Sequence, residues 1–142
     1  MGEKLEISSD GKTLLKVLDK NITIFKIPYG IETIGESAFY GCSALQSIDI
    51  PNSVTMIKEI AFSHCTALQS IDLPNSVTYI GNGAFQDCSA LHSIDIPNSV
   101  TSIGCWAFTG CSNLQKINIP KSVIKLGEAA LCCGDSIQYI DV

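Results

Sequence analysis

Residues 45–65 read LQSIDIPNSVTMIKEIAFSHC, and most of this stretch recurs at residues 68–88 and 91–111. The copies start 23 residues apart, and all five prolines of the chain keep that spacing, at Pro28, Pro51, Pro74, Pro97 and Pro120. A fixed period of about 20–50 residues is the signature of a repeat architecture. We therefore expect a single domain over residues 1–142 whose repeats span 28–50, 51–73, 74–96, 97–119 and 120–142.

The end of each repeat has the two-residue alternation of a half-buried strand. In the first repeat Ile48 and Ile50 share one face, and Ser47 and Asp49 share the other. Pro51 follows, and a proline ends a strand because it has no N–H to donate to a neighbouring strand. Each repeat is therefore expected to contribute one short strand whose apolar face belongs to the core.

The remainder of each repeat predicts turns. Val54 and Ile57 indicate a second, short extended or turn segment, and the glycine that usually follows is expected to adopt a backbone conformation that most residues avoid. Phe62 and Cys65 are three residues apart, which predicts one helical or 3-10 turn. Lys58 stands in the glycine column, so the turn geometry of that repeat stays open.

One repeat cannot be stable alone, because its core side chains do not offset the conformational entropy of its backbone. Since every repeat runs the same way, stacking places equivalent strands side by side as a parallel sheet, about 4.8 Å apart. The expected fold is a β-rich α/β solenoid: a right-handed coil with a parallel concave sheet and short helical or 3-10 turns on the other side.

Residues 1–27 predict an N-terminal cap. ITIFKI, at residues 22–27, fits the strand half of a repeat, with Ile22, Phe25 and Ile27 in core columns. LEISSDGKTLLKV before it predicts a β-hairpin that turns at residues 8–11.

The last repeat is degenerate. Leu131 replaces the usual Phe, Gly134 replaces the usual Cys, and the repeat stops at Val142 directly after a strand. An uncovered edge strand invites pairing. We therefore expect a homodimer through the C-terminal edge strand as one alternative.

The columns LxxIxIPxxVTxIGxxAFxxC, at Leu45–Cys65 and repeated to Cys111, resemble the BspA-like (Treponema pallidum-type) 23-residue leucine-rich repeat of surface proteins from anaerobic bacteria and parasitic protists. The resemblance covers nearly the whole chain, including a DGKTLLKV cap. It implies a leucine-rich-repeat solenoid and, for many members, secreted or cell-surface adhesion to host or bacterial proteins. It names no catalytic residues.

Composition excludes several functions. The chain carries 9 basic and 14 acidic residues, for a net charge of −5, with no lysine or arginine cluster, so nucleic-acid binding is not expected. No apolar run has the length of a membrane span, and the opening MGEKLEISSDGKTLLKV has no signal-peptide h-region. Either the protein is cytoplasmic or a signal has been removed.

Four of the seven cysteines occupy one column of the repeat, at Cys42, Cys65, Cys88 and Cys111. A column presents its side chains in a row, whereas zinc needs four ligands that converge. We expect buried thiols, with a disulfide or a metal site as alternatives. Cys105, Cys132 and Cys133 lie outside the column and are the better candidates for reactivity.

The other chemical candidates have structural readings. Aspartates form a solvent-facing column at Asp49, Asp72, Asp95 and Asp141, with a calcium site as the alternative. His64 and His92 lie on different parts of the coil, and His64 should point away from the buried Cys65, so a Cys/His nucleophile pair is not expected. No cofactor and no enzymatic activity are predicted.

Recognition is expected where the repeats differ, because the fold does not dictate those residues. Met56, Ile60, Tyr79 and Trp106 come from two variable columns and predict an apolar contact surface, with packing between coils as the alternative. Lys116, Lys121 and Tyr139 break the uniform polar rows of the sheet face and are the first choice for a specific contact. The predicted function is a protein-binding, adhesion-type module; the alternative is a structural or self-associating segment of a longer array.

Overall fold

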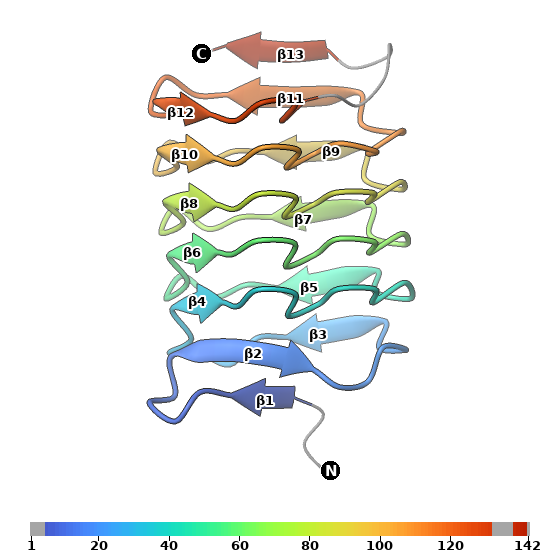
Figure 1. Cartoon of the computed structure of the whole chain (residues 1–142), viewed down its shortest axis with the longest axis vertical. Helices are drawn as coiled ribbons and strands as arrows, with labels where there is room; N and C mark the ends of the chain where they lie inside the picture. Colours follow the sequence, from blue (N-terminus) through green and yellow to red (C-terminus); the bar gives the residue numbers. More distant parts are fainter. Residues whose placement is uncertain (1–4, 132–137, 142) are drawn as a thin grey trace.

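The computed structural model describes residues 5–131 and 138–141, and in this part of the chain it contains strands and turns but no helix. The coils stack along the long axis of the molecule, with the two termini at opposite ends (Figure 1). The strands are β1 (Leu5–Ile7), β2 (Thr13–Val17), β3 (Ile24–Lys26), β4 (Thr33–Ile34), β5 (Ser47–Asp49), β6 (Met56–Ile57), β7 (Ser70–Asp72), β8 (Tyr79–Ile80), β9 (Ser93–Asp95), β10 (Ser102–Ile103), β11 (Lys116–Ile119), β12 (Lys125–Leu126) and β13 (Gln138–Asp141).

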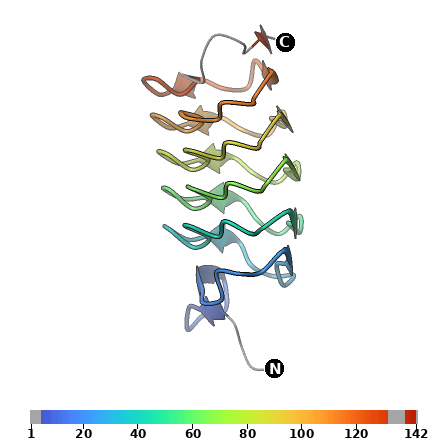
Figure 2. The same cartoon turned by 90° about the vertical axis from the view of Figure 1, so that its right-hand side faces the viewer.

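Two sets of strands line different sides of the coil, as Figure 2 shows. The larger sheet has the order β1-β2-β4-β6-β8-β10-β12 and is parallel except for the β1–β2 hairpin. The second set forms a four-stranded parallel sheet, β7-β9-β11-β13, and a separate pair, β3-β5. The prediction of parallel stacking is confirmed. The prediction of a single sheet is wrong, because the short segment after each proline also forms strands and the strand-end sheet is interrupted between β5 and β7.

The helical or 3-10 turn is not present either. Ser63 N–H donates to the Ile60 carbonyl at 3.2 Å and Cys65 N–H to the Phe62 carbonyl at 3.2 Å, so the AFxxC segment is a run of tight turns. Ile60 and His64 have left-handed φ values of 48° and 64°. A left-handed residue cannot continue a right-handed helix, and because one occurs at every fourth position, no helix can propagate.

Backbone hydrogen bonds join each coil to both neighbours. In the turn segment the N–H groups donate forward: Ile60 to the Asn82 carbonyl at 2.9 Å and Phe62 to the Ala84 carbonyl at 2.8 Å. Next to the strands they donate backward, as Lys58 does to the Ile34 carbonyl at 2.9 Å. Lys58 makes the same backward bond as Gly81 and Gly104 do, so its turn keeps the geometry of the glycine coils.

The core consists of columns of identical residues. Four phenylalanine rings stack with centroids 4.9, 5.3 and 5.4 Å apart and planes within 9° of parallel, in the order Phe39, Phe62, Phe85 and Phe108. Phe25 of the cap closes the stack edge-on, with its ring 5.4 Å from that of Phe39. The expected hairpin cap is confirmed: β1 and β2 pair antiparallel, and Asp10 accepts a 2.6 Å hydrogen bond from the Ser8 hydroxyl in the turn between them.

The last strand is out of step with the repeat frame. Ile94 pairs with Ile117, 23 residues later, but Ile117 pairs with Tyr139, 22 residues later. Strand β13 is therefore shifted by one residue, and such a shift exchanges the two faces of a strand. Tyr139, rather than Ile140, takes the backbone position opposite the buried Ile117.

The glycine that follows the second strand is required for close approach, not for an unusual φ, which corrects the sequence interpretation. A Cβ atom on Gly81 would lie 2.7 Å from the backbone nitrogen of Glu59 and 2.8 Å from the carbonyl carbon of Lys58. The left-handed glycines stand elsewhere, for example Gly41 and Gly83, with φ of 73° and 63°.

Gly81→Ala is expected to lower the free energy of unfolding by about 2–3 kcal/mol, because two coils must move apart to admit the methyl group. Gly41→Ala is the matched control: nothing lies within 4 Å of its Cβ position, so only the left-handed φ costs stability, about 1 kcal/mol. Urea unfolding of both variants tests this ordering. Equal losses would show that the coils do not press on Gly81.

Candidate functional site

The cysteine column is part of the core. Cys42, Cys65, Cys88 and Cys111 are fully buried, which confirms that prediction. Their Sγ atoms donate to phenylalanine carbonyls of the preceding coil, as Cys65 does to Phe39 at 3.2 Å and Cys88 to Phe62 at 3.1 Å. Burial raises the pKa of Cys88 from 9.0 to about 12 and also raises the pKa values of Cys42 and Cys65. Such protonated thiols are poor nucleophiles.

His64 lies in a polar contact between coils. Its Nδ1 is 3.0 Å from the Ser63 hydroxyl, its Nε2 is 3.4 Å from Asp87 Oδ2, and its ring centre is 5.3 Å from that of Tyr40. The Ser63 side chain is only 2% exposed, so a substrate cannot reach its hydroxyl. His64 is 47% exposed and points away from the buried Cys65, as the sequence predicted. The Ser/His/Asp contact is therefore a bridge between coils, not a catalytic triad.

The aspartate column faces solvent as expected, with Asp49, Asp72 and Asp95 exposed. Asn118, which interrupts it, donates from Nδ2 to the Ile96 carbonyl at 3.1 Å and accepts from Ile96 N–H at 2.9 Å. Across residues 5–131 and 138–141, no three His, Cys, Asp or Glu side chains are grouped to hold a metal ion. The same residues include no helix with the length and apolarity of a membrane span.

Three of the predicted contact residues lie in neighbouring coils. Met56 and Tyr79 are paired across β6 and β8, and the Tyr79 hydroxyl donates to Glu59 Oε2 at 2.6 Å. This bond raises the pKa of Tyr79 to about 12 and lowers that of Glu59. It also holds the Tyr79 ring end beside the residue that precedes Ile60. All three predicted residues are half-buried.

Ile60 and Trp106 share the column that is left-handed in all five repeats: Ser37 at 61°, Ile60 at 48°, Gly83 at 63°, Trp106 at 57° and Ala129 at 56°. Trp106 is 49% exposed. Ile60 leans over the next coil, with its Cγ2 atom 3.0 Å from the Cβ position of Gly83. We call Met56, Ile60, Tyr79 and Trp106 the apolar ridge.

The remaining predicted residues lie away from the ridge. Lys116 is exposed in β11, in register with Ser93, and Lys121 is exposed in the turn after that strand. Tyr139 is in β13, opposite Ile117. Lys116 and Lys121 therefore belong to the last part of the second sheet, and the structure separates them from the ridge by its placement on the larger sheet and the turns.

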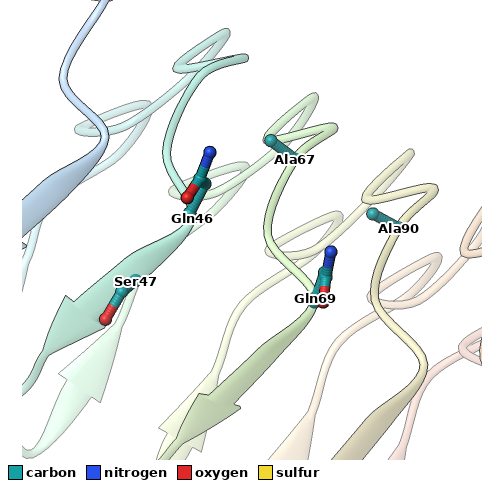
Figure 3. A pocket seen from close by; sticks show the side chains of 5 residues that line it. All are labelled: Gln46, Ser47, Ala67, Gln69 and Ala90. Carbon is teal, nitrogen blue, oxygen red and sulfur yellow. The ribbon is translucent and has the colours of Figure 1, made fainter.

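Two contiguous hollows, of about 460 and 430 Å3, run across the coils where the strands of the second sheet begin. We call them the amide furrow. Figure 3 shows Gln46 and Gln69 extending in the same direction from neighbouring coils, with Ala67 and Ala90 in the loops beside them. The furrow is lined by Gln46, Ala67, Gln69, Ala90, His92 and Gln115.

The first hollow lies where the second sheet is interrupted, since it is bordered by Ser47 of β5 and by Gln69 just before β7. Sequence reasoning recognised the glutamine row but missed the furrow. The signal was the row of small residues two positions earlier, Ala67 and Ala90, whose short side chains leave the space open.

A parallel solenoid of 23-residue coils, with a leucine and isoleucine core and asparagine or serine turns after each strand, defines the class of leucine-rich-repeat proteins. The family model described as BspA type leucine rich repeat region matches residues 18–140 in six copies. The chain belongs to the BspA-type leucine-rich-repeat family.

Solved structures agree with this assignment. The T. pallidum leucine-rich repeat protein TpLRR superposes with a TM-score of 0.73 at 23% identity, over 87% of this chain and 78% of that one. A leucine-rich cell surface protein of Faecalibacterium prausnitzii gives 0.57 at 28% identity, over 87% of this chain and 42% of that one. A leucine-rich repeat protein of Eubacterium ventriosum gives 0.75 at 27% identity, over 99% of this chain and 42% of that one. No curated protein sequence matches significantly.

The buried thiols predict an alkaline loss of stability. The folded chain holds the Cys88 proton up to a pKa of about 12, whereas an unfolded thiol releases it near 9.0. The stabilisation is therefore complete below pH 9.0 and is lost as the pH rises towards 12, by about 1.4 kcal/mol per pH unit for each such thiol.

Cys88→Ala should make this slope shallower by the contribution of one thiol in urea unfolding between pH 9 and 11. Val77→Ala, another buried truncation, should lower stability at every pH and keep the slope. Identical slopes in Cys88→Ala and the parent chain would contradict the raised pKa.

Proposed function

We propose that this chain is a non-enzymatic protein-binding module whose contact surface is the apolar ridge. The observation that carries the proposal is the backbone strain at Ile60 and Trp106. A left-handed conformation costs a residue other than glycine roughly 1–2 kcal/mol and is an outlier for a β-branched or bulky side chain. Gly83 occupies the same column, so the coil itself accepts a residue with no strain.

Strained residues of this kind cluster at binding sites, because selection keeps a costly side chain where it is used. Trp106 and Tyr79 also have the composition of binding hot spots, where large aromatic side chains supply most of the affinity. Family membership supports the general function, since repeats of this class commonly mediate protein interactions. The F. prausnitzii relative is a cell surface protein, and we propose a secreted or surface location for this chain on that likeness.

A random-peptide display library panned on the immobilised domain tests the ridge. We expect selected peptides to bind Trp106→Gly about 30-fold more weakly, since loss of a hot-spot aromatic costs about 2 kcal/mol. The variant should unfold at nearly the same urea concentration, because glycine relieves the strain at this position.

Ala129→Gly is the matched control: it makes the same backbone change in the same column without removing a large side chain. Its peptide binding should equal that of the parent chain. Peptides that bind Trp106→Gly and the parent chain equally would refute the ridge as the contact surface.

A second candidate function, self-association through the C-terminal edge, rests on β12. Leu126 stands in a core column, yet it is 48% exposed, and Ile124 is 80% exposed. Thr55, Thr78 and Thr101 occupy the column of Ile124 in earlier repeats, and each hydroxyl donates to the preceding coil, as Thr101 does to the Thr78 carbonyl at 3.3 Å. An exposed apolar edge strand is a template for pairing with another chain.

Ile124→Thr restores the column residue and removes the exposed apolar side chain. If β12 joins two copies, static light scattering at increasing concentration should show a dimer for the parent chain and a monomer for the variant. A monomeric parent chain at the highest concentration would rule out this second function.

A further inference from the structure

We propose that the amide furrow binds a linear, neutral polysaccharide that runs along the solenoid axis. The ridge and the furrow lie on different segments of each coil, so this site is independent of the protein-binding function. Its floor is Ala67 and Ala90, and its wall is the row Gln46, Gln69, His92 and Gln115, one residue from each of four successive coils.

The wall offers hydrogen-bonding groups that the protein leaves unused. No side-chain hydrogen bond of Gln46, Gln69 or Gln115 is found within the part of the chain that the structure describes, and all three residues are exposed. Each carboxamide has two N–H donors and an accepting oxygen. A hydroxyl both donates and accepts, so a polyhydroxylated ligand can use every group of the row.

Charge excludes the polyanions. No charged residue lines either hollow, and the chain carries −5 overall. A phosphate or sulfate polymer needs lysine or arginine contacts, and a protein hot spot needs large aromatic or arginine anchors. The furrow has neither, which leaves a neutral polar ligand.

Spacing favours a glycan over a peptide. Equivalent residues of paired parallel strands are about 4.8 Å apart, so the row repeats at that distance. An extended peptide presents side chains on one face about every 6.7 Å and falls out of step after two coils. An extended pyranose chain advances by nearly one coil per sugar, so successive sugars meet equivalent amides. Asn113 closes one end, where its Nδ2 donates to the Ser89 carbonyl at 2.8 Å.

The test uses cellohexaose, chitohexaose, mannohexaose and maltohexaose, each titrated into the whole chain while NMR follows the side-chain amide signals of the glutamines. At least one hexasaccharide should shift these signals. Affinity should rise from the disaccharide to the tetrasaccharide and then level off, because the row spans four coils. Gln69→Ala should weaken binding about 5-fold by removing one hydrogen-bonding partner, and Ala90→Leu at least 10-fold by filling the floor.

Gln86→Ala makes the same chemical change outside the furrow and should bind like the parent chain, as should Trp106→Gly, which separates this proposal from the ridge. The proposal is wrong if none of the four hexasaccharides shifts the glutamine signals at millimolar concentration. It is also wrong if affinity does not depend on length, or if an extended neutral peptide competes for Gln69 as well as the best hexasaccharide does.

Discussion

Every coil of this protein depends on its neighbours for the partners of its own backbone. Strand-side N–H groups donate to the coil before, and turn-side groups donate to the coil after, so a coil is held from two directions by bonds of 2.7–3.3 Å. Buried backbone groups without partners are costly. The spacing between coils is therefore set by the hydrogen bonds, and the side chains must fit that spacing.

Several sequence columns follow from this constraint. The phenylalanine rings can stack with nearly parallel planes because identical residues lie in register one coil apart. Gly81 has no side chain because the backbone of the preceding coil lies where its Cβ would be. The thiols of Cys65 and Cys88 fill a small apolar space and still donate to a phenylalanine carbonyl. The repeated residues are thus those that two coils share.

This explains which parts of the fold were predictable. Burial was, because a column that stays apolar in every repeat, such as that of Ile57 and Ile80, reports directly on the core. Turn conformation was not: Phe62 and Cys65 have the spacing of a helical turn, and only the left-handed φ of Ile60 and His64 shows otherwise. Neither isoleucine nor tryptophan signals such a φ, since both disfavour it. The shift of β13 was hidden because the proline frame counts residues, while pairing follows the backbone.

The candidate surfaces divide in the same way. The glutamine row was visible in the sequence, but a row becomes a furrow only where its neighbours are small and the sheet is interrupted, and the interruption between β5 and β7 leaves no trace in nearly identical repeats. Lys116 and Tyr139 stood out as departures from the polar rows, yet the shifted register of β13 places Tyr139 opposite a core residue.

Two columns of the repeat are left-handed, and they differ in a way that separates fold from function. One holds Gly41, His64, Asp87 and Gly110, all residue types that tolerate this conformation. The backbone alone accounts for that choice. The other holds Ile60 and Trp106, which the backbone disfavours, beside Gly83, which it prefers. Since the coil gains nothing from a strained tryptophan that remains half exposed, the reason for Trp106 must lie outside the coil, in whatever its exposed ring contacts.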